Sequence, residues 1–146
     1  MVNRKFLYRA LRPTEIKRRV LIPKEPLAPF AAGLMFPQVF PVRFGEWPEH
    51  AVRAQQRDSD RFPTSGVSTT PHLKRAKHYA QHNQTIARIA IDRLAARGVQ
   101  TFRVSKYVQP SLISKPEDDE VILVCPGAKY FPKEIIVDIF KLPASR

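Results

Sequence analysis

Short apolar runs separated by turn residues dominate the pattern of this chain, and most of them predict strands. They are rich in the β-branched and aromatic residues that strands favour. These runs lie at residues 5–10, 65–69, 86–91, 101–105, 120–124 and 134–142. Gly98 closes a charged turn after the third run, and Pro126-Gly127 marks a turn before the last. The later part of the chain is therefore predicted to consist mainly of strands.

Helical spacing occurs in shorter stretches of the earlier part. Pro13 suits the first position of a short basic helix that runs through Arg19. A helix is also predicted over residues 46–57, and another begins at Thr70-Pro71 with Thr70 as its cap. Residues 22–48 are rich in proline and aromatic residues, which predicts a long irregular segment that packs against the rest. Together these elements predict an α+β fold.

Length and charge narrow the class of protein. A chain of 146 residues with 43% hydrophobic residues is expected to form one domain, over residues 1–146, with a real core. The formal charge of +12 favours a polyanionic partner such as nucleic acid, or an acidic protein that neutralises it. A charge that serves solubility alone is the plainer alternative.

Cysteine content and apolar segments bear on the compartment. Cys125 is the only cysteine, so no intrachain disulfide forms, and its apolar surroundings predict a buried structural thiol. No apolar stretch approaches the roughly 18 residues that a membrane span requires. Residues 1–6 lack a signal-peptide core. We therefore expect a cytoplasmic protein without a membrane partner.

Several kinds of site are absent from the sequence. Neither a GxGxxG nor a GxxxxGK phosphate loop occurs, and there is no GxSxG nucleophile elbow. His78 and His82 could share one helix face, but no third ligand accompanies them. A solvated basic face explains this pair better than a metal site, so no metal is predicted.

Arg9, Ser68 and Glu120 remain as a widely spaced set of chemically useful residues. Cleavage of nicotinamide from NAD passes through an oxocarbenium-like ribosyl cation, which a nearby carboxylate stabilises. A planar guanidinium binds a diphosphate, and a serine hydroxyl can orient the carboxylate. Each residue taken alone also has a plain structural explanation: a surface arginine, an edge strand before a helix cap, and one solvated acid among four.

Several short motifs follow one another in a recognisable order over most of the chain. They are Leu7-Tyr8-Arg9, Arg12-Pro13, Glu49-His50-Ala51, Gly66-Val67-Ser68-Thr69-Thr70 and Asp118-Asp119-Glu120-Val121 with Gly127 beyond. In this order the chain resembles the R-S-E class of mono-ADP-ribosyltransferases, the group of cholera toxin and heat-labile enterotoxin. The resemblance implies a split β-sandwich with short helices in the N-terminal half, and NAD as a substrate.

The same resemblance implies roles for individual residues. Glu120 would be the catalytic carboxylate, Ser68 would position it, and Arg9 would bind the phosphates and ribose of NAD. The NAD-binding set would comprise Arg9, Tyr8, His50, Ser68, Thr69 and Thr70. Asp118 stands where the family has the first acid of Glu-x-Glu, which helps to select the acceptor. With Lys106 and Gln109 it would contact the acceptor, and its shorter side chain puts arginine specificity in doubt.

The charge of the chain orders the candidate acceptors. A basic enzyme attracts a phosphate backbone, so a nucleic acid, RNA or single-stranded DNA, is the first expectation. Modification of arginine in a protein by a secreted effector is the alternative, and transfer of an RNA 2′-phosphate to NAD is a further one. A basic RNA-binding module without catalysis stays open as another class. A transferase of this kind resembles a bacterial toxin from a toxin–antitoxin or phage-defence system, with an acidic antitoxin or immunity protein as partner.

Overall fold

The computed structural model describes residues 5–23, 66–107, 111, 113, 115–126 and 128–143. The predicted helix over residues 46–57 lies outside these residues, as does all but the start of the predicted irregular segment at 22–48. Within the described part, no helix is both long and apolar enough to cross a membrane.

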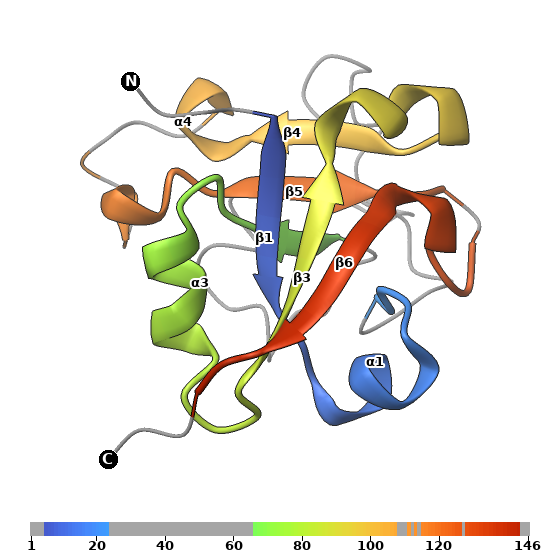
Figure 1. Ribbon diagram of the computed structural model, residues 1–146. Coiled ribbons are helices and arrows are strands. Elements are labelled where there is room, and N and C mark those ends of the chain that lie inside the picture. Colours follow the sequence, from blue (N-terminus) through green and yellow to red (C-terminus); the bar gives the residue numbers. More distant parts are fainter. Residues whose placement is uncertain are drawn as a thin grey trace, which may run out of the picture.

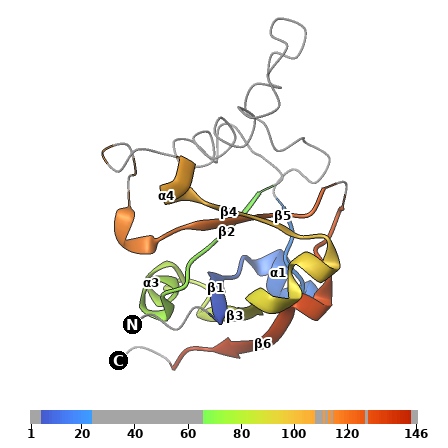
Figure 2. The same cartoon turned by 90° about the horizontal axis from the view of Figure 1, so that it is seen from above.

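Two three-stranded antiparallel sheets form the body of the protein. The first has the order β1 (Phe6–Ala10), β3 (Thr85–Ala90), β6 (Ile136–Lys141), and the second has the order β2 (Val67–Thr69), β5 (Val121–Val124), β4 (Gln100–Arg103). The strands of one sheet cross those of the other at a steep angle (Figure 1). Figure 2 shows the two sheets as separate layers. The predicted α+β fold is confirmed.

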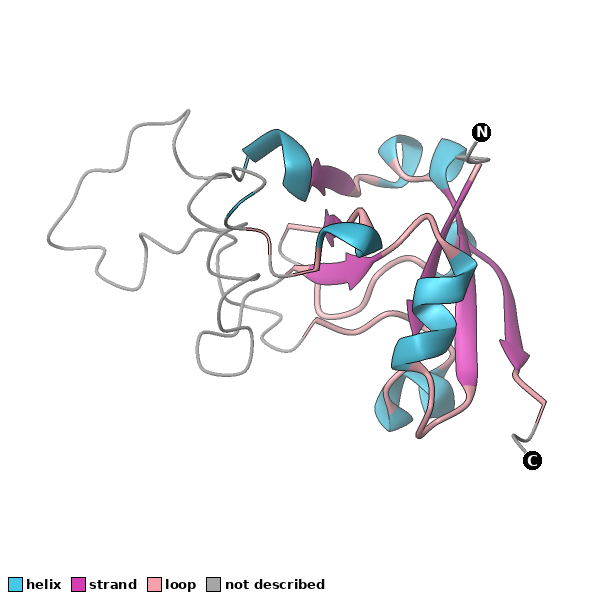
Figure 3. Ribbon diagram, turned by 90° about the vertical axis from the view of Figure 1, so that its left-hand side faces the viewer, coloured by secondary structure: helices cyan, strands magenta, loops and turns pink. Residues whose placement is uncertain are grey.

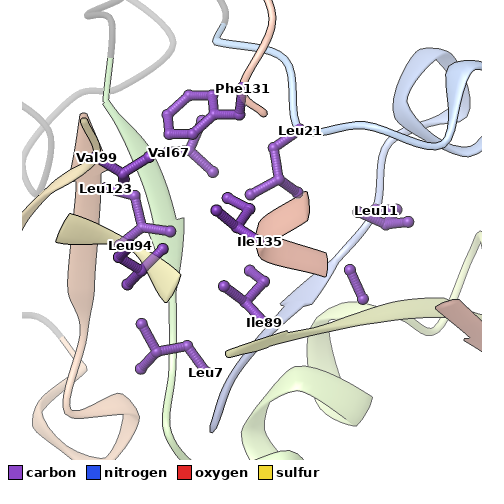
Figure 4. Packing of buried hydrophobic residues seen from close by; sticks show 11 residues of the cluster. Leu7, Leu11, Leu21, Val67, Ile89, Leu94, Val99, Leu123, Phe131 and Ile135 are labelled. Carbon is purple, nitrogen blue, oxygen red and sulfur yellow. The ribbon is translucent and has the colours of Figure 1, made fainter. Parts of the chain in front are cut away.

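The main hydrophobic core lies between these layers. Leu7 and Ile89 face each other across β1 and β3, while Leu123 approaches from β5 (Figure 4). Phe131 and Ile135, from the connection before β6, complete this core and are at most 2% exposed. Full burial of such a side chain contributes about 1.5–3 kcal/mol, so this cluster is what holds the sheets together.

A smaller core covers the other face of the first sheet. Ala76 and Ala80 of the segment around α3 (Leu73–Tyr79) pack with Ile86 of β3 and Phe140 of β6. Their small side chains let the helix approach the strands closely. Figure 3 shows α3 beside this sheet. The other α-helices among the described residues are α1 (Pro13–Arg18), which follows β1, and α4 (Val104–Tyr107), which follows β4.

An isolated antiparallel bridge joins the two sheets at the place where the candidate site lies. Tyr8 N donates to the carbonyl of Thr70 at 2.7 Å, and Thr70 N donates back to the carbonyl of Tyr8 at 2.9 Å. These two bonds fix the end of β2 against the middle of β1. Residues from both sheets are thereby placed side by side.

All the predicted strands are present, with ends that differ from the prediction by one or two residues. The run at residues 101–105 is strand only to Arg103, because the chain turns into α4 at Val104, whose backbone N makes a last bond to the carbonyl of Glu120. The run at 134–142 begins as a 3₁₀ helix, Lys133–Ile135, and extends as β6 from Ile136. Helix α3 starts at Leu73 rather than at Pro71: its cap is His72, and the hydroxyl of Thr70 accepts from the backbone N–H of that cap instead of from one inside the helix.

Of the short helices predicted for the N-terminal half, the described residues contain α1. The 3₁₀ helices and α4 lie later in the chain. Gly98 closes the predicted charged turn in the left-handed region, with a φ of 76°. Cys125 is a free thiol that is partly rather than fully buried and packs against the main core. Burial raises the pKa of this thiol, which agrees with a structural role.

Candidate active site

A pocket of about 420 Å³ lies where β1, β2, α3 and the loop before β5 meet. This volume falls within the range of small-molecule sites. Its walls combine backbone and side chains from both sheets. The lining residues are Tyr8, Arg9, Ala10, Leu11, Arg12, Ser68, Thr69, Thr70, Ala76, Tyr79, Asn83, Lys115, Asp118 and Glu120.

Ser68 and Glu120 are in direct contact in this pocket. Thr69 is paired with Val121 in the β2–β5 register, so Ser68 and Glu120 are diagonal neighbours on one face. Ser68 Oγ donates to Glu120 Oε2 at 2.6 Å. A hydroxyl that donates to a carboxylate makes a short, charge-assisted bond, which fixes the orientation of the acid.

Arg9 reaches the same place from β1. Its Nη1 donates to the carbonyl of Ser68 at 2.9 Å, and its Nε and Nη2 donate to the carboxylate of Glu15. The side chain of Arg9 is only 13% exposed. The structure therefore brings Arg9, Ser68 and Glu120 together in one pocket, although they are far apart in the sequence.

Glu15 is a residue that the sequence interpretation did not single out. It lies in the first turn of α1 and is fully buried. Burial alone would raise the pKa of its carboxyl, but the charge of Arg9 and the hydrogen bonds from Arg9 and two backbone N–H groups hold it below its ordinary value. A signal was present: Glu15 stands three residues after Arg12, in the position from which a helix acid bonds back to the cap.

Tyr8, Thr69 and Thr70 line the pocket as well, and the two threonines fasten β2 to the loop before β5. Thr69 Oγ1 donates to the carbonyl of Val121 at 2.7 Å, and Thr70 Oγ1 donates to the carbonyl of Asp118 at 2.5 Å. Thr70 Oγ1 also accepts from His72 N at 3.1 Å. These bonds set the path of the chain from Asp118 to Val121, and thus the position of Glu120.

Asp118 is buried, and two residues of α3 hold its carboxylate. Arg75 Nε donates to Oδ1 at 2.7 Å, and the hydroxyl of Tyr79 donates to Oδ2. The Arg75 guanidinium also lies 5.7 Å from the centroid of the Tyr79 ring. Arg75 and Tyr79 are four residues apart, so they share a helix face, and this spacing is the signal in the sequence that could have paired them.

The remaining predicted site residues lie elsewhere. Lys106 is exposed on α4, with its Nζ 5.9 Å from the centroid of the Tyr107 ring, and it is not among the pocket residues. His50 and Gln109 lie outside the described residues. His78 and His82 are exposed. In the described ranges, no three His, Cys, Asp or Glu side chains are grouped closely enough to hold a metal ion.

Comparison with known proteins gives information on the fold alone. No protein-family model matches the sequence, and no curated protein matches it. Among solved structures the chain is similar to EcPltA, an ADP-ribosyltransferase subunit of a pertussis-like toxin. The two share 17% identity over 99% of this chain and 79% of that one, with a TM-score of 0.46. At this level the likeness carries no functional argument, so any assignment depends on the side chains of the pocket.

Proposed function

We propose that this protein is a mono-ADP-ribosyltransferase that uses NAD as its substrate. The observation that carries the proposal is the 2.6 Å bond from Ser68 to Glu120, in a pocket whose wall also holds Arg9. An oriented carboxylate suits a reaction that develops positive charge on a ribose, and a guanidinium suits the adjoining diphosphate.

The proposed chemistry needs little beyond this arrangement. The bond between ribose C1′ and the nicotinamide nitrogen breaks, and its electron pair neutralises the pyridinium as nicotinamide leaves. Glu120 faces the cationic C1′, with Ser68 holding one of its oxygens. The acceptor forms a bond to C1′ and loses a proton, which Glu120 or water accepts. Because the leaving group is already cationic, no strong general acid is required.

A protein side chain is the acceptor that local charge favours. Asp118 and Glu120 both line the pocket, but Asp118 is paired with Arg75, so Glu120 is the carboxylate beside which a nucleophile would attack C1′. Charges farther away than about 8 Å are strongly screened at physiological salt. At contact the Glu120 carboxylate therefore counts for more than the net charge of the chain, and it attracts a cationic side chain such as arginine.

Nucleic acid is the second candidate, and the formal charge of +12 favours it. Such a charge acts at longer range and increases the rate of encounter with a polyanion, most strongly at low salt. The same charge would also serve a basic RNA-binding module without catalysis. The three possibilities differ in where ADP-ribose is found after incubation with NAD.

The test is incubation of the protein with labelled NAD and separate pools of protein, RNA and single-stranded DNA. We expect label in the protein pool, and Glu120→Gln should reduce it at least about 100-fold. Glu134→Gln makes the same chemical change at an exposed position and should retain activity. Label in RNA or DNA would keep the enzyme class and change the acceptor. Folded protein that labels none of the pools would overturn the proposal.

A further inference from the structure

Arg12 lines the same pocket as Arg9. It lies at the junction between β1 and α1, immediately before Pro13. Glu15 connects the two arginines. Its Oε1 accepts from Arg9 Nη2 at 3.1 Å, from the backbone N of Arg12 at 3.0 Å and from Arg12 Nε at 3.4 Å.

The other oxygen of Glu15 anchors this group to the rest of the chain. Oε2 accepts from Arg9 Nε at 3.1 Å and from the backbone N of Ile22 at 3.0 Å. Arg12 Nη2 donates to the carbonyl of the same Ile22. A fully buried carboxylate thus holds two guanidinium groups at one end of the pocket. Two positive charges against one negative charge leave a net positive charge there, which suits an anion.

The two arginines differ in how much of their hydrogen-bonding capacity the protein already uses. A guanidinium carries five N–H donors. In contacts between described residues, Arg9 donates through Nε, Nη1 and Nη2, whereas Arg12 donates through Nε and Nη2. Among the contacts between described residues, Arg12 Nη1 has no acceptor. The side chain of Arg12 is 33% exposed, compared with 13% for Arg9. Arg12 is therefore the more accessible donor to a ligand.

We infer that Arg12 is a second phosphate-binding residue for the diphosphate of NAD, and that Glu15 is the positioning residue that fixes both arginines. This inference rests on the proposed function, because it takes its ligand from it. Arg9 and Arg12 would each contact the diphosphate, with Glu15 preventing them from moving apart under their mutual repulsion. Charge-assisted contacts of this kind pair a guanidinium with phosphate oxygens in a fixed geometry.

The first experiment measures the affinity of Arg12→Ala for NAD, for ADP-ribose and for inorganic diphosphate by titration calorimetry. Loss of a bond to a charged group should raise all three dissociation constants about 10- to 100-fold. Arg97→Ala, which removes an exposed arginine outside the pocket, should leave them within about threefold. Arg12→Lys should recover part of the loss, since it restores the charge without the planar fork. Unchanged affinity in Arg12→Ala would overturn the assignment.

The second experiment tests the positioning role of Glu15. Glu15→Gln keeps the shape of the side chain but replaces one acceptor oxygen with an amide donor, which then faces the N–H donors that Glu15 accepts from. We therefore expect a higher KM for NAD and a lower thermal stability. We expect kcat to change less than KM. Val99→Ala is the matched control, because it destabilises the main core away from the pocket and should lower the melting temperature without raising KM. A Glu15→Gln enzyme that loses stability but keeps its affinity for NAD would contradict the positioning role.

Measurements of NAD binding and of ADP-ribose transfer distinguish a failure of this inference from a failure of the proposed function on which it rests. If the wild type binds NAD through Arg12 but transfers no ADP-ribose to any pool, the proposed function fails and the binding site stands. If transfer is normal and Arg12→Ala leaves both KM and the dissociation constants unchanged, the inference fails and the function stands.

Discussion

Arg103 holds the carboxylate of Asp119 through two parallel bonds, Nε to Oδ1 at 3.1 Å and Nη2 to Oδ2 at 2.9 Å. Asp119 lies between two residues of the pocket, and its backbone is in the left-handed region with a φ of 45°. This conformation turns the chain so that Asp118 and Glu120 both line the pocket while Asp119 faces Arg103. The pair therefore stabilises a backbone geometry on which the proposed catalytic acid depends.

Substitution of Asp119 should reveal the free-energy cost of a positive φ at this position. Asp119→Ala and Asp119→Gly both remove the ion pair, but only glycine adopts a positive φ without strain. We expect Asp119→Ala to be less stable than Asp119→Gly by about 1 kcal/mol, measured by urea denaturation. At an ordinary surface position the order would be reversed, so an alanine variant that is the more stable of the two would contradict the argument.

Removal of the Ser68 hydroxyl should affect the chemical step more than binding. Ser68→Ala leaves the Glu120 carboxylate without its 2.6 Å donor, and a bond to a charged group of this kind corresponds to about a 10- to 100-fold effect. We expect kcat for ADP-ribosyl transfer to fall by that factor while the affinity for NAD changes little.

Thr85→Val is the control for Ser68→Ala. It removes a buried hydroxyl that donates to the carbonyl of Asn83 at 2.9 Å, and Thr85 does not line the pocket. This variant should lose about 1 kcal/mol of stability and retain its kcat. A Ser68→Ala enzyme with the same kcat as Thr85→Val would show that the Ser68–Glu120 bond does not contribute to catalysis.

The sequence predicted the strands well because their apolar runs are short and clearly bounded. It also ordered Arg9, Ser68 and Glu120 along the chain, and the pocket contains all three. Their meeting depends on the Tyr8–Thr70 bridge and on the β2–β5 register. Both are long-range pairings that a local pattern does not specify, so the sequence could suggest the set but not its geometry.

The roles of charged residues on the short helices were not predicted from the sequence. Glu15 and Arg75 follow patterns that are usual for solvated helix faces, yet Glu15 is fully buried and Arg75 holds Asp118. The misplaced start of α3 has a related cause. The hydroxyl of Thr70 accepts from the backbone N of His72, which is itself the helix cap, and it donates to the carbonyl of Asp118 from a distant loop. In each case a tertiary partner determined the role of a polar side chain.

The ionisation of Glu15 should make stability depend on pH in the acid range. A carboxyl whose pKa is lower in the folded state stabilises the protein above its unfolded pKa, roughly 4.3, and this contribution is lost as the pH falls through the folded value. Breaking a buried ion pair costs about 3–5 kcal/mol, so Glu15→Gln should be less stable by that order at pH 7. The difference from the wild type, measured by urea denaturation, should shrink below about pH 4 as the wild-type carboxyl gains its proton. A difference that stays constant with pH would show that the charge of Glu15 is not what stabilises α1.

The hydroxyl of Tyr79 should ionise late. Partial burial, then the hydrogen bond to Asp118 and the negative charge of that residue, raise the pKa of Tyr79 to about 12, although Arg75 opposes the shift. Since the folded pKa is raised, the stabilisation is complete below about pH 10, the ordinary tyrosine value, and is lost as the pH rises through the folded value. Ultraviolet titration of phenolate should show this late component, with circular dichroism to confirm that the fold persists. Tyr79→Phe should remove the component, and Asp118→Asn should shift it toward lower pH because the neighbouring negative charge is gone. A late component that survives in Tyr79→Phe would mean that another tyrosine is responsible and that Tyr79 does not donate to Asp118 in solution.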